Sequence, residues 1–208
     1  MKVVISPQAF KGGLSGIEAA QAISLGLMRV FPQARMTLLP VADGGDGTME
    51  ALVQSTCGRY LDTQVTGPLG DSINVKWAVA GDSDTALIEM ARASGLALIP
   101  AGRRDPTTAT SYGTGELIRK ALDRGCRKII VGLGGSATND GGAGIVQALG
   151  ARLTGANHEE IGMGGGCLSE LAHVDLSGLD PRLKLCHIRA ATDVNNPLCG
   201  VNGASAIY

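Results

Sequence analysis

The stretch "KIIVGLGGSATNDGGAGIVQALG", residues 128–150, joins an apolar run to a helical pattern through a glycine-rich loop. "KIIVGL" predicts a strand that is buried on both faces. "GGAGIVQALG" predicts a helix that ends at Gly150. A strand, a loop and a helix in this order form the repeating unit of α/β layer folds, so we expect an α/β protein.

The beginning of the chain repeats this order. "KVVIS" and "MTLLPV" predict strands. Between them, Ser15 and Glu18 form a capping-box pattern, and an apolar stripe at helical spacing follows it. "MEALVQSTCG" predicts a second helix, which we expect to end at Gly58.

The pattern changes near Thr66. Residues 60–81 predict an antiparallel hairpin around "GPLGD", and "TALIEMA" predicts a third extended run. Pro100 to Thr114 is expected to be a long loop, after which "GELIRKALDRG" predicts a helix and "LKLCHIRAATDV" contains a strand. We therefore place an approximate boundary at Thr66. We expect residues 1–66 to form an N-terminal α/β segment and residues 67–208 to form a second α/β lobe.

Composition narrows the function. The chain has 208 residues, a net charge of −1 and an aromatic fraction of 3%. This balance argues against nucleic-acid and membrane partners. The five cysteines form no CxxC pair, which predicts reduced thiols and a cytoplasmic protein.

The glycine-rich loop allows more than one function. "GLGGSA" fits the dinucleotide pattern G-x-G-x-x-A, but the acidic residue expected about 20 positions later is absent until Glu159. An anion site requires only that the backbone amides from Gly134 to Asn139 turn toward a phosphate. Asp140 is then a helix cap or a metal-side carboxylate. The remaining alternative is a tight turn that binds no ligand.

Three other loops carry charged residues. In "VADGGDGT", Asp43 and Asp46 suit Mg²⁺, although capping also explains them. Lys11 in "SPQAFKGG" is an anion ligand or a solvated surface lysine. Asp193 follows a predicted strand, where a general base, a metal ligand or a simple cap would stand.

Six motifs occur in a fixed order along the chain: "SPQAFKGGLS", "VADGGDGT", "GTGELI", "GLGGSATNDGGAG", "GLDPRL" and "DVNNPLCGVNGAS". Together they closely resemble the bacterial glycerate kinase family of type 1, which phosphorylates D-glycerate with ATP. The resemblance covers essentially the whole chain. It implies a two-lobed α/β fold without a Walker A motif, in which one lobe is a flavodoxin-like parallel sheet and the other a smaller mixed α/β unit. It also implies ATP and Mg²⁺ as cofactors and 2-phosphoglycerate as the product, and it allows a homodimer.

The resemblance also suggests residue roles. Asp193 matches the family's catalytic carboxylate, and Lys11 and Asp43 match active-site segments. From the chemistry of phosphoryl transfer, we expect Asp193 or Asp43 to bind Mg²⁺ and one of them to accept the glycerate hydroxyl proton. Lys11 would pair with the substrate carboxylate or the transferring phosphate. The ATP phosphates would bind the amides of Gly134, Gly135, Ser136, Ala137, Thr138 and Asn139.

The chain departs from the family in two ways. Gln8 and Ala9 stand where relatives have Asp and Ser, and the chain stops at "GASAIY", before a "GPQKGA"-like segment. The resemblance therefore implies a C-terminally truncated chain, in which residues 1–66 lack a C-terminal partner segment and the lobe of residues 67–208 is incomplete. We expect uncovered apolar faces and reduced stability. The alternative function is an inactive remnant that only binds nucleotide or glycerate. A dinucleotide-dependent oxidoreductase is supported by "GLGGSA" alone.

Overall fold

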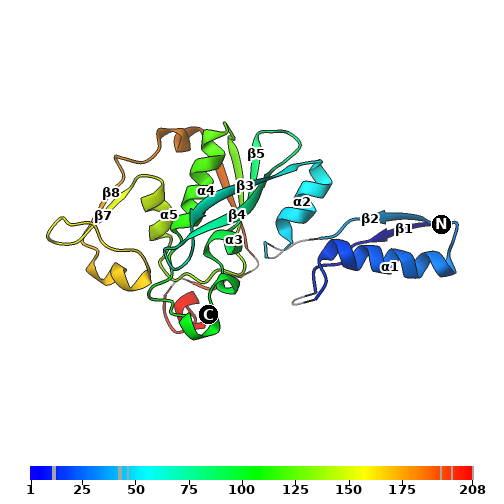
Figure 1. Cartoon of the computed structure of the whole chain (residues 1–208), viewed down its shortest axis with the longest axis horizontal. Coiled ribbons are helices and arrows are strands. Elements are labelled where there is room, and N and C mark those ends of the chain that lie inside the picture. The colour runs from blue at the N-terminus through cyan, green and yellow to red at the C-terminus, as the bar shows by residue number, and fades with distance from the viewer. Residues whose placement is uncertain (11–12, 42–43, 46, 193, 198, 208) are drawn as a thin grey trace.

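The computed structural model describes residues 1–10, 13–41, 44–45, 47–192, 194–197 and 199–207. Most of them belong to one body, in which helices cover both faces of a central sheet (Figure 1). A small unit, made of the first helix and the first two strands, projects from one side of this body (Figure 1). The chain thus combines two α/β arrangements of very different size.

The small unit contains two parallel strands and one helix. Strands β1 (Lys2–Ile5) and β2 (Arg35–Leu38) pair directly, and α1 (Gly16–Val30) connects them. The predicted capping box is confirmed. The Ser15 hydroxyl accepts the Glu18 N–H, and the Glu18 carboxylate accepts the Ser15 N–H at 2.8 Å.

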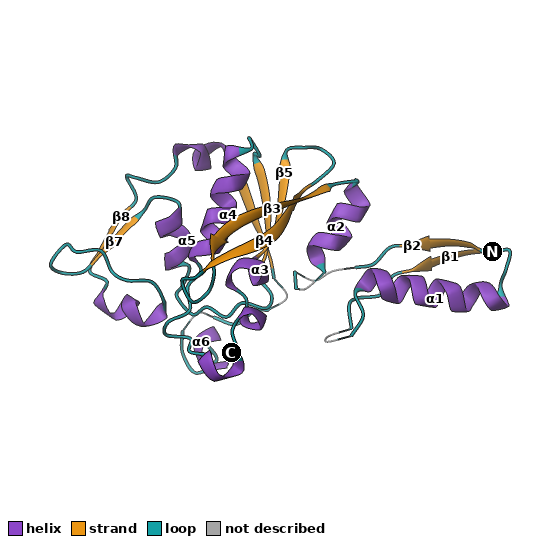
Figure 2. Ribbon diagram, in the orientation of Figure 1, coloured by secondary structure: helices purple, strands orange, loops and turns teal. Residues whose placement is uncertain are grey.

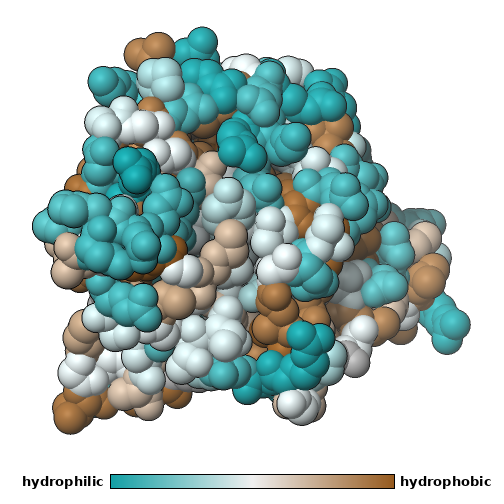
Figure 3. Space-filling view, turned by 60° about the vertical axis from the view of Figure 1, so that its left-hand side comes forward, coloured by the Kyte–Doolittle hydropathy of each residue, from teal (hydrophilic) through white to brown (hydrophobic). Residues whose placement is uncertain are grey.

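Many apolar side chains of the small unit are exposed. Val30, in the predicted apolar stripe of α1, is 68% exposed and Val4 in β1 is 64% exposed, whereas Ala20 of the same stripe is fully buried. The predicted apolar stripe therefore forms a helix but packs against the two strands only in part. In a view turned by 60° from that of Figure 1, exposed apolar side chains appear as separate brown patches among polar and pale residues (Figure 3).

The central sheet has five strands in the order β3 (Arg59–Thr66), β4 (Ser72–Val79), β5 (Thr85–Glu89), β6 (Lys128–Gly132) and β9 (His187–Ala191). The β3–β4 pair is the predicted antiparallel hairpin, and β4–β5 is also antiparallel. Strands β5, β6 and β9 run parallel. The α/β fold class is confirmed, with a mixed sheet at its centre.

Helices pack on both faces of this sheet (Figure 2). One face is covered by α3 (Met90–Ser94), α4 (Tyr112–Asp123) and α5 (Ala143–Ala148), and the other by α2 (Thr48–Thr56). Neighbouring residues of β6 point to opposite faces because side chains alternate along a strand. Ile129 packs into the core under α4, and Ile130 packs into the core under α2. The prediction that this strand is buried on both faces is confirmed.

Two helix ends test the expected glycine caps. Gly150 has a φ of +103°, so α5 ends as expected. Helix α2 ends at Thr56, and Cys57 rather than Gly58 takes the left-handed conformation, with a φ of 54°. Gly58 is needed for close approach instead, because a Cβ there would lie 2.6 Å from the carbonyl oxygen of Val79.

The described residues also include a two-stranded sheet, four short 3₁₀ helices and a final helical turn. They are η1 (Leu96–Leu98), η2 (Ala101–Arg103), β7 (Arg152–Thr154), η3 (Gly165–Glu170), β8 (His173–Asp175), η4 (Pro181–Leu185) and α6 (Ala204–Ile207). Within the described ranges, no helix combines the length and apolarity needed to cross a bilayer.

The chain passes from the two-stranded sheet of β1 and β2 to the five-stranded sheet before Thr66. Strand β3 pairs with β4 along its whole length, and α2 packs against β4 and β5. Residues 48–66 therefore lie with the large body in this structure. The division of the chain into lobes at Thr66 stays a prediction about folding units.

Candidate functional site

Three loops meet at the carboxyl edge of the parallel strands, where open α/β sheets bind ligands. The Gly134 N–H donates to the Gly44 carbonyl oxygen at 3.1 Å. A Cβ on Gly44 would lie 2.5 Å from the Ala191 carbonyl oxygen, and a Cβ on Gly132 would lie 2.7 Å from the Gly44 carbonyl oxygen. Glycine therefore allows the loops that follow β6 and β9 to contact the loop that precedes α2.

Part of the glycine-rich loop is held by its own backbone. Besides Gly134, Ala137 donates its N–H to the Ser94 carbonyl oxygen at 2.9 Å. The Thr138 N–H donates to the Ser136 hydroxyl at 3.0 Å. These three of the six predicted phosphate-binding amides are already hydrogen-bonded. The expected anion site is therefore reduced to the amides of Gly135, Ser136 and Asn139.

The other three amides have the properties of an anion site. The N–H groups of Gly135, Ser136 and Asn139 have no hydrogen-bond acceptor among the residues that the structure describes. Gly135 is exposed and has a φ of +73°, while its carbonyl oxygen accepts the Leu96 N–H. N–H donors that have no acceptor among the described residues, on a loop held by its own backbone, fit an anion such as a phosphate.

Polar side chains line the same loop. The hydroxyl oxygens of Ser136 and Thr138 are 2.8 Å apart and share a hydrogen bond. The Ser205 hydroxyl donates to Asn139 Oδ1 at 2.7 Å. The last helical turn, α6, thereby contacts the loop and forms one side of the site.

Asp140 is buried and anchors the loop. Its carboxylate accepts the N–H groups of Gly142 and Gly144, at 3.0 and 3.2 Å. It also accepts the N–H and the hydroxyl of Ser111, both at 2.8 Å. The N-cap position of α5 is Gly142, so Asp140 is not the N-cap residue. It accepts the Gly144 N–H in the first turn of α5 and the two donors of Ser111, and these contacts favour a structural role for a carboxylate that is only 2% exposed.

Lys11, Asp43 and Asp193, the predicted catalytic residues, lie outside the described residues, as does Asp46. Their described neighbours in sequence, Gly44 and Thr192, belong to the loops that meet at the carboxyl edge. Across the described ranges, no group of three or more acidic, histidine or cysteine side chains could hold a metal. The magnesium ligands therefore stay a prediction.

The loop after β1 reaches the start of α2. The Ala9 Cβ lies 3.9 Å from the place that a Cβ on Gly47 would take. Ala9, Gly47 and Glu50 help to line a cavity of about 10 Å³, which has room for about one water molecule. The segment that carries Gln8 and Ala9 thus contacts the helix that follows the acidic loop.

A charged group at this edge escaped the sequence analysis. Glu89 ends β5 and is 4% exposed. One of its carboxylate oxygens accepts the Met49 N–H at 2.9 Å, and the other accepts Arg92 Nε–H at 2.9 Å. The Arg92 guanidinium also donates to Glu50 Oε1 at 2.7 Å. The sequence signal was a carboxylate at the end of the apolar run "TALIE", which a buried strand tolerates only when the carboxylate is paired.

These charges shift the pKa values of Arg92 and Tyr60. Burial acts to lower the pKa of the Arg92 guanidinium, but the hydrogen bond and charge of Glu89, together with Glu50, raise it above its usual value. Burial and the charge of Glu50 raise the pKa of the Tyr60 phenol. Arg92 therefore stays protonated between its two carboxylates.

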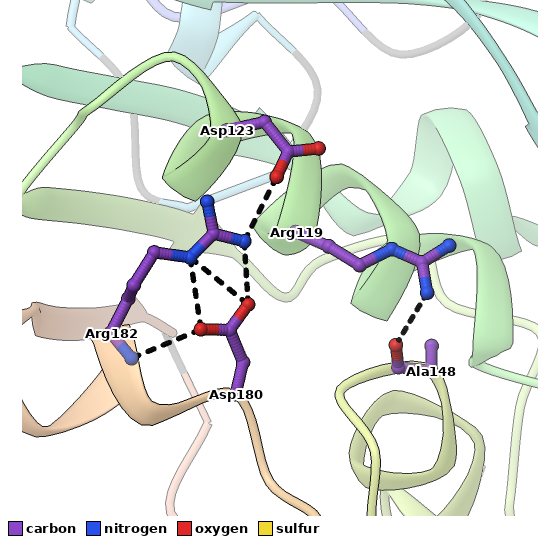
Figure 4. Close-up of polar contacts among 5 residues, drawn as sticks. All are labelled: Arg119, Asp123, Ala148, Asp180 and Arg182. Atoms are coloured by element: carbon purple, nitrogen blue, oxygen red, sulfur yellow. Dashed lines mark hydrogen bonds and ion pairs between the residues drawn. The ribbon is translucent and has the colours of Figure 1, made fainter.

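A second charged cluster lies at the C-terminal end of α4 (Figure 4). Arg182 donates to both oxygens of Asp180 and to Asp123 Oδ1, the last at 2.8 Å. The pKa of the Asp180 carboxyl is lowered by these hydrogen bonds. A cavity of about 470 Å³ borders the cluster, and Arg119 beside it donates to the Ala148 carbonyl oxygen. The guanidinium of Arg182 is thus neutralised within the chain, and it ties η4 to the end of α4.

Comparison with known proteins agrees with the architecture. The sequence profile of the Glycerate kinase family matches residues 3–208. The chain is 58% identical over 208 residues to the Glycerate 2-kinase of Escherichia coli (strain K12). The alignment covers 100% of this chain and 55% of that protein. It is 53% identical to the Glycerate kinase of Bacillus subtilis (strain 168), of which it covers 54%.

A solved structure gives the same result. The chain assigned as glycerate kinase 2 from Salmonella typhimurium LT2 superposes with a TM-score of 0.91 at 55% identity. The match covers 100% of this chain and 56% of that one. The present chain spans about half the length of the relatives that it matches. The two-lobed α/β fold implied by the resemblance is confirmed by this match, and the dinucleotide interpretation of "GLGGSA" loses its basis. The chain belongs to the glycerate kinase family.

Proposed function

We propose that this chain takes part in the ATP- and Mg²⁺-dependent phosphorylation of D-glycerate to 2-phosphoglycerate. The observation that carries the proposal is the meeting of three loops at the carboxyl edge, where Gly135, Ser136 and Asn139 present unpaired N–H groups among the described residues. The name of the Escherichia coli relative, Glycerate 2-kinase, supports the position of the phosphate.

We assign different roles in phosphoryl transfer to different residues of the chain. Bound Mg²⁺–ATP supplies the phosphoryl group. The N–H groups of Gly135, Ser136 and Asn139 hold phosphate oxygens and neutralise their charge. We assign to Asp193 the role of general base, which accepts the proton of the glycerate 2-hydroxyl as its oxygen forms the new P–O bond and the bond to ADP breaks. Asp43 helps to bind the metal, and Lys11 pairs with the glycerate carboxylate.

A second candidate function is binding without catalysis. The chain spans about 55% of the Escherichia coli relative, and Gln8 and Ala9 offer no carboxylate or hydroxyl. In this case the chain would bind nucleotide or D-glycerate without turnover. We further propose that the protein is cytoplasmic, which its five free cysteines support. Whether it forms a homodimer is decided by size-exclusion chromatography.

The two functions are separated by measuring ADP release with D-glycerate and ligand binding in parallel. If the chain is a kinase, Asp193→Asn should lower kcat by about 10²-fold or more, because a general base contributes roughly 10²–10⁴-fold. The matched control is Asp62→Asn, which changes an exposed carboxylate on β3 and should leave kcat unchanged. Phosphorus NMR of the product identifies the esterified hydroxyl.

The outcomes are distinct. Binding without ADP release supports the second function, and absence of both rejects both. If Asp193→Asn keeps kcat within about threefold of the unmodified chain, then Asp193 is not the base.

A further inference from the structure

We propose that Arg92 is a positioning residue, which with Glu89 and Glu50 clamps the first turn of α2 and so holds the loop carrying Asp43 and Asp46 at the carboxyl edge. This inference rests on the proposed function for its catalytic consequence. The clamp itself rests on contacts that the structure shows.

Among the described residues, no side chain at the N-cap position caps the N-terminus of α2. The N-cap position is Gly47, with a φ of 90°, and it offers no side chain to the first free N–H groups of the helix. Glu89, which is 40 positions later in the chain, accepts the Met49 N–H instead. A carboxylate at a helix N-terminus is stabilised by the helix dipole, so Glu89 replaces the missing cap from another element.

Arg92 connects this cap to the helix a second time. Its Nε–H bonds the same Glu89 carboxylate, and its Nη2 bonds Glu50 in the first turn of α2. The planar guanidinium can contact both carboxylates at once, which an ammonium group cannot do with the same geometry. The start of α2 is therefore fixed to the end of β5 through Glu89 and to α3 through Arg92.

The acidic loop is attached directly to this fixed turn. Thr48 donates its hydroxyl to the Gly45 carbonyl oxygen at 2.7 Å, and Gly44 donates its N–H back to the Thr48 hydroxyl. Gly44 in turn contacts Gly134. In sequence, Asp43 precedes Gly44 and Asp46 follows Gly45. A shift of the first turn of α2 would therefore move Gly44 and Gly45 relative to the phosphate-binding loop. Phosphoryl transfer loses rate with small errors in position.

The experiment compares Arg92→Met with Arg119→Met as the matched control. Like Arg92, Arg119 pairs with a glutamate three residues earlier in the chain and is partly exposed, but its other hydrogen bond goes to the Ala148 carbonyl oxygen at the end of α5. Hydrogen–deuterium exchange read by mass spectrometry should be faster by about fivefold or more in residues 47–53 and 132–140 of Arg92→Met, because charge-assisted hydrogen bonds are lost. Arg119→Met should leave these peptides unchanged. Arg92→Lys keeps the charge and should restore part of the protection.

In kinetics, Arg92→Met should lower kcat about tenfold with the KM for D-glycerate within about threefold, since a misplaced loop affects the chemical step more than glycerate binding. If the unmodified chain transfers no phosphate, the proposed function fails while the exchange data still decide the clamp. Unchanged exchange in Arg92→Met, exchange that rises equally in all peptides, or an unchanged kcat in an active chain would each overturn the inference.

Discussion

The small β1–α1–β2 unit and the five-stranded body are built from the same elements but bury them differently. Helix α4 lies across the large sheet and buries Leu117 completely, whereas α1 leaves Val30 of its apolar stripe 68% exposed. Both helices have clear amphipathic patterns and defined ends. The difference teaches that helix formation is a local property, while the stability gained from a helix depends on what lies against its apolar face.

The largest effect should come from a cavity in the large body. Leu117→Ala removes a fully buried side chain between the sheet and α4, and should lower the free energy of unfolding by about 2–5 kcal/mol. Trp77 is the only tryptophan in the sequence and is 2% exposed in the same core, so its fluorescence reports this transition. Leu25→Ala is the control, which should shift the Trp77 transition by less than about 0.5 kcal/mol. Equal shifts for both variants would mean that the two units unfold as one.

A smaller effect is expected from the cap of α1. Ser15→Ala removes the hydroxyl that accepts the Glu18 N–H, and should destabilise α1 by about 1 kcal/mol. Hydrogen exchange in residues 16–22 should become faster while the Trp77 transition stays in place. Ser24→Ala, inside the same helix, is the control and should not speed exchange. A shift of the Trp77 transition in Ser15→Ala would show that the small unit stabilises the large one.

The smallest effect concerns acid stability. Hydrogen bonds from the Thr85 hydroxyl and from the N–H groups of Asp84 and Thr85 lower the pKa of the Asp82 carboxyl. A lowered folded-state pKa contributes stability above the unfolded value of about 3.9, and this contribution is lost as the pH falls through the folded value. Asp82→Asn should therefore be less stable than the unmodified chain at pH 6, and the difference should shrink below about pH 4. Urea unfolding followed by Trp77 fluorescence measures it, and a difference that grows with acid would contradict the assignment.

Much of the fold could be predicted because its signals are local. The capping box at Ser15, the β3–β4 hairpin and the helix end at Gly150 depend on a few neighbouring residues and are found as expected. The end of α2 was displaced by one residue, because Gly58 is required for its closeness to Val79 and not for its own φ. In the sequence, a glycine required by close approach of a distant segment cannot be told apart from a glycine required by a turn.

The candidate site could be predicted only in outline. The glycine-rich loop lies at the carboxyl edge as a strand–loop–helix pattern indicates. Its amides divide into bonded and unpaired groups because Ser94 and Gly44 happen to lie beside it. Glu89 and Arg92 were missed for the same reason, since their partner residues are about 40 positions away in sequence.

The sequence by itself determined most of the main strands and helices, their order and the family, and it pointed to the loops that we propose carry the chemistry. These follow from backbone preferences and side-chain periodicity, which act over a few residues. Only the tertiary structure decided that Asp140 joins Ser111 to the first turn of α5, that Glu89 accepts the Met49 N–H of α2, and that α1 stays largely uncovered while α4 is buried. Each of these depends on which groups lie within hydrogen-bonding or van der Waals distance across the fold, and that is a property of packing.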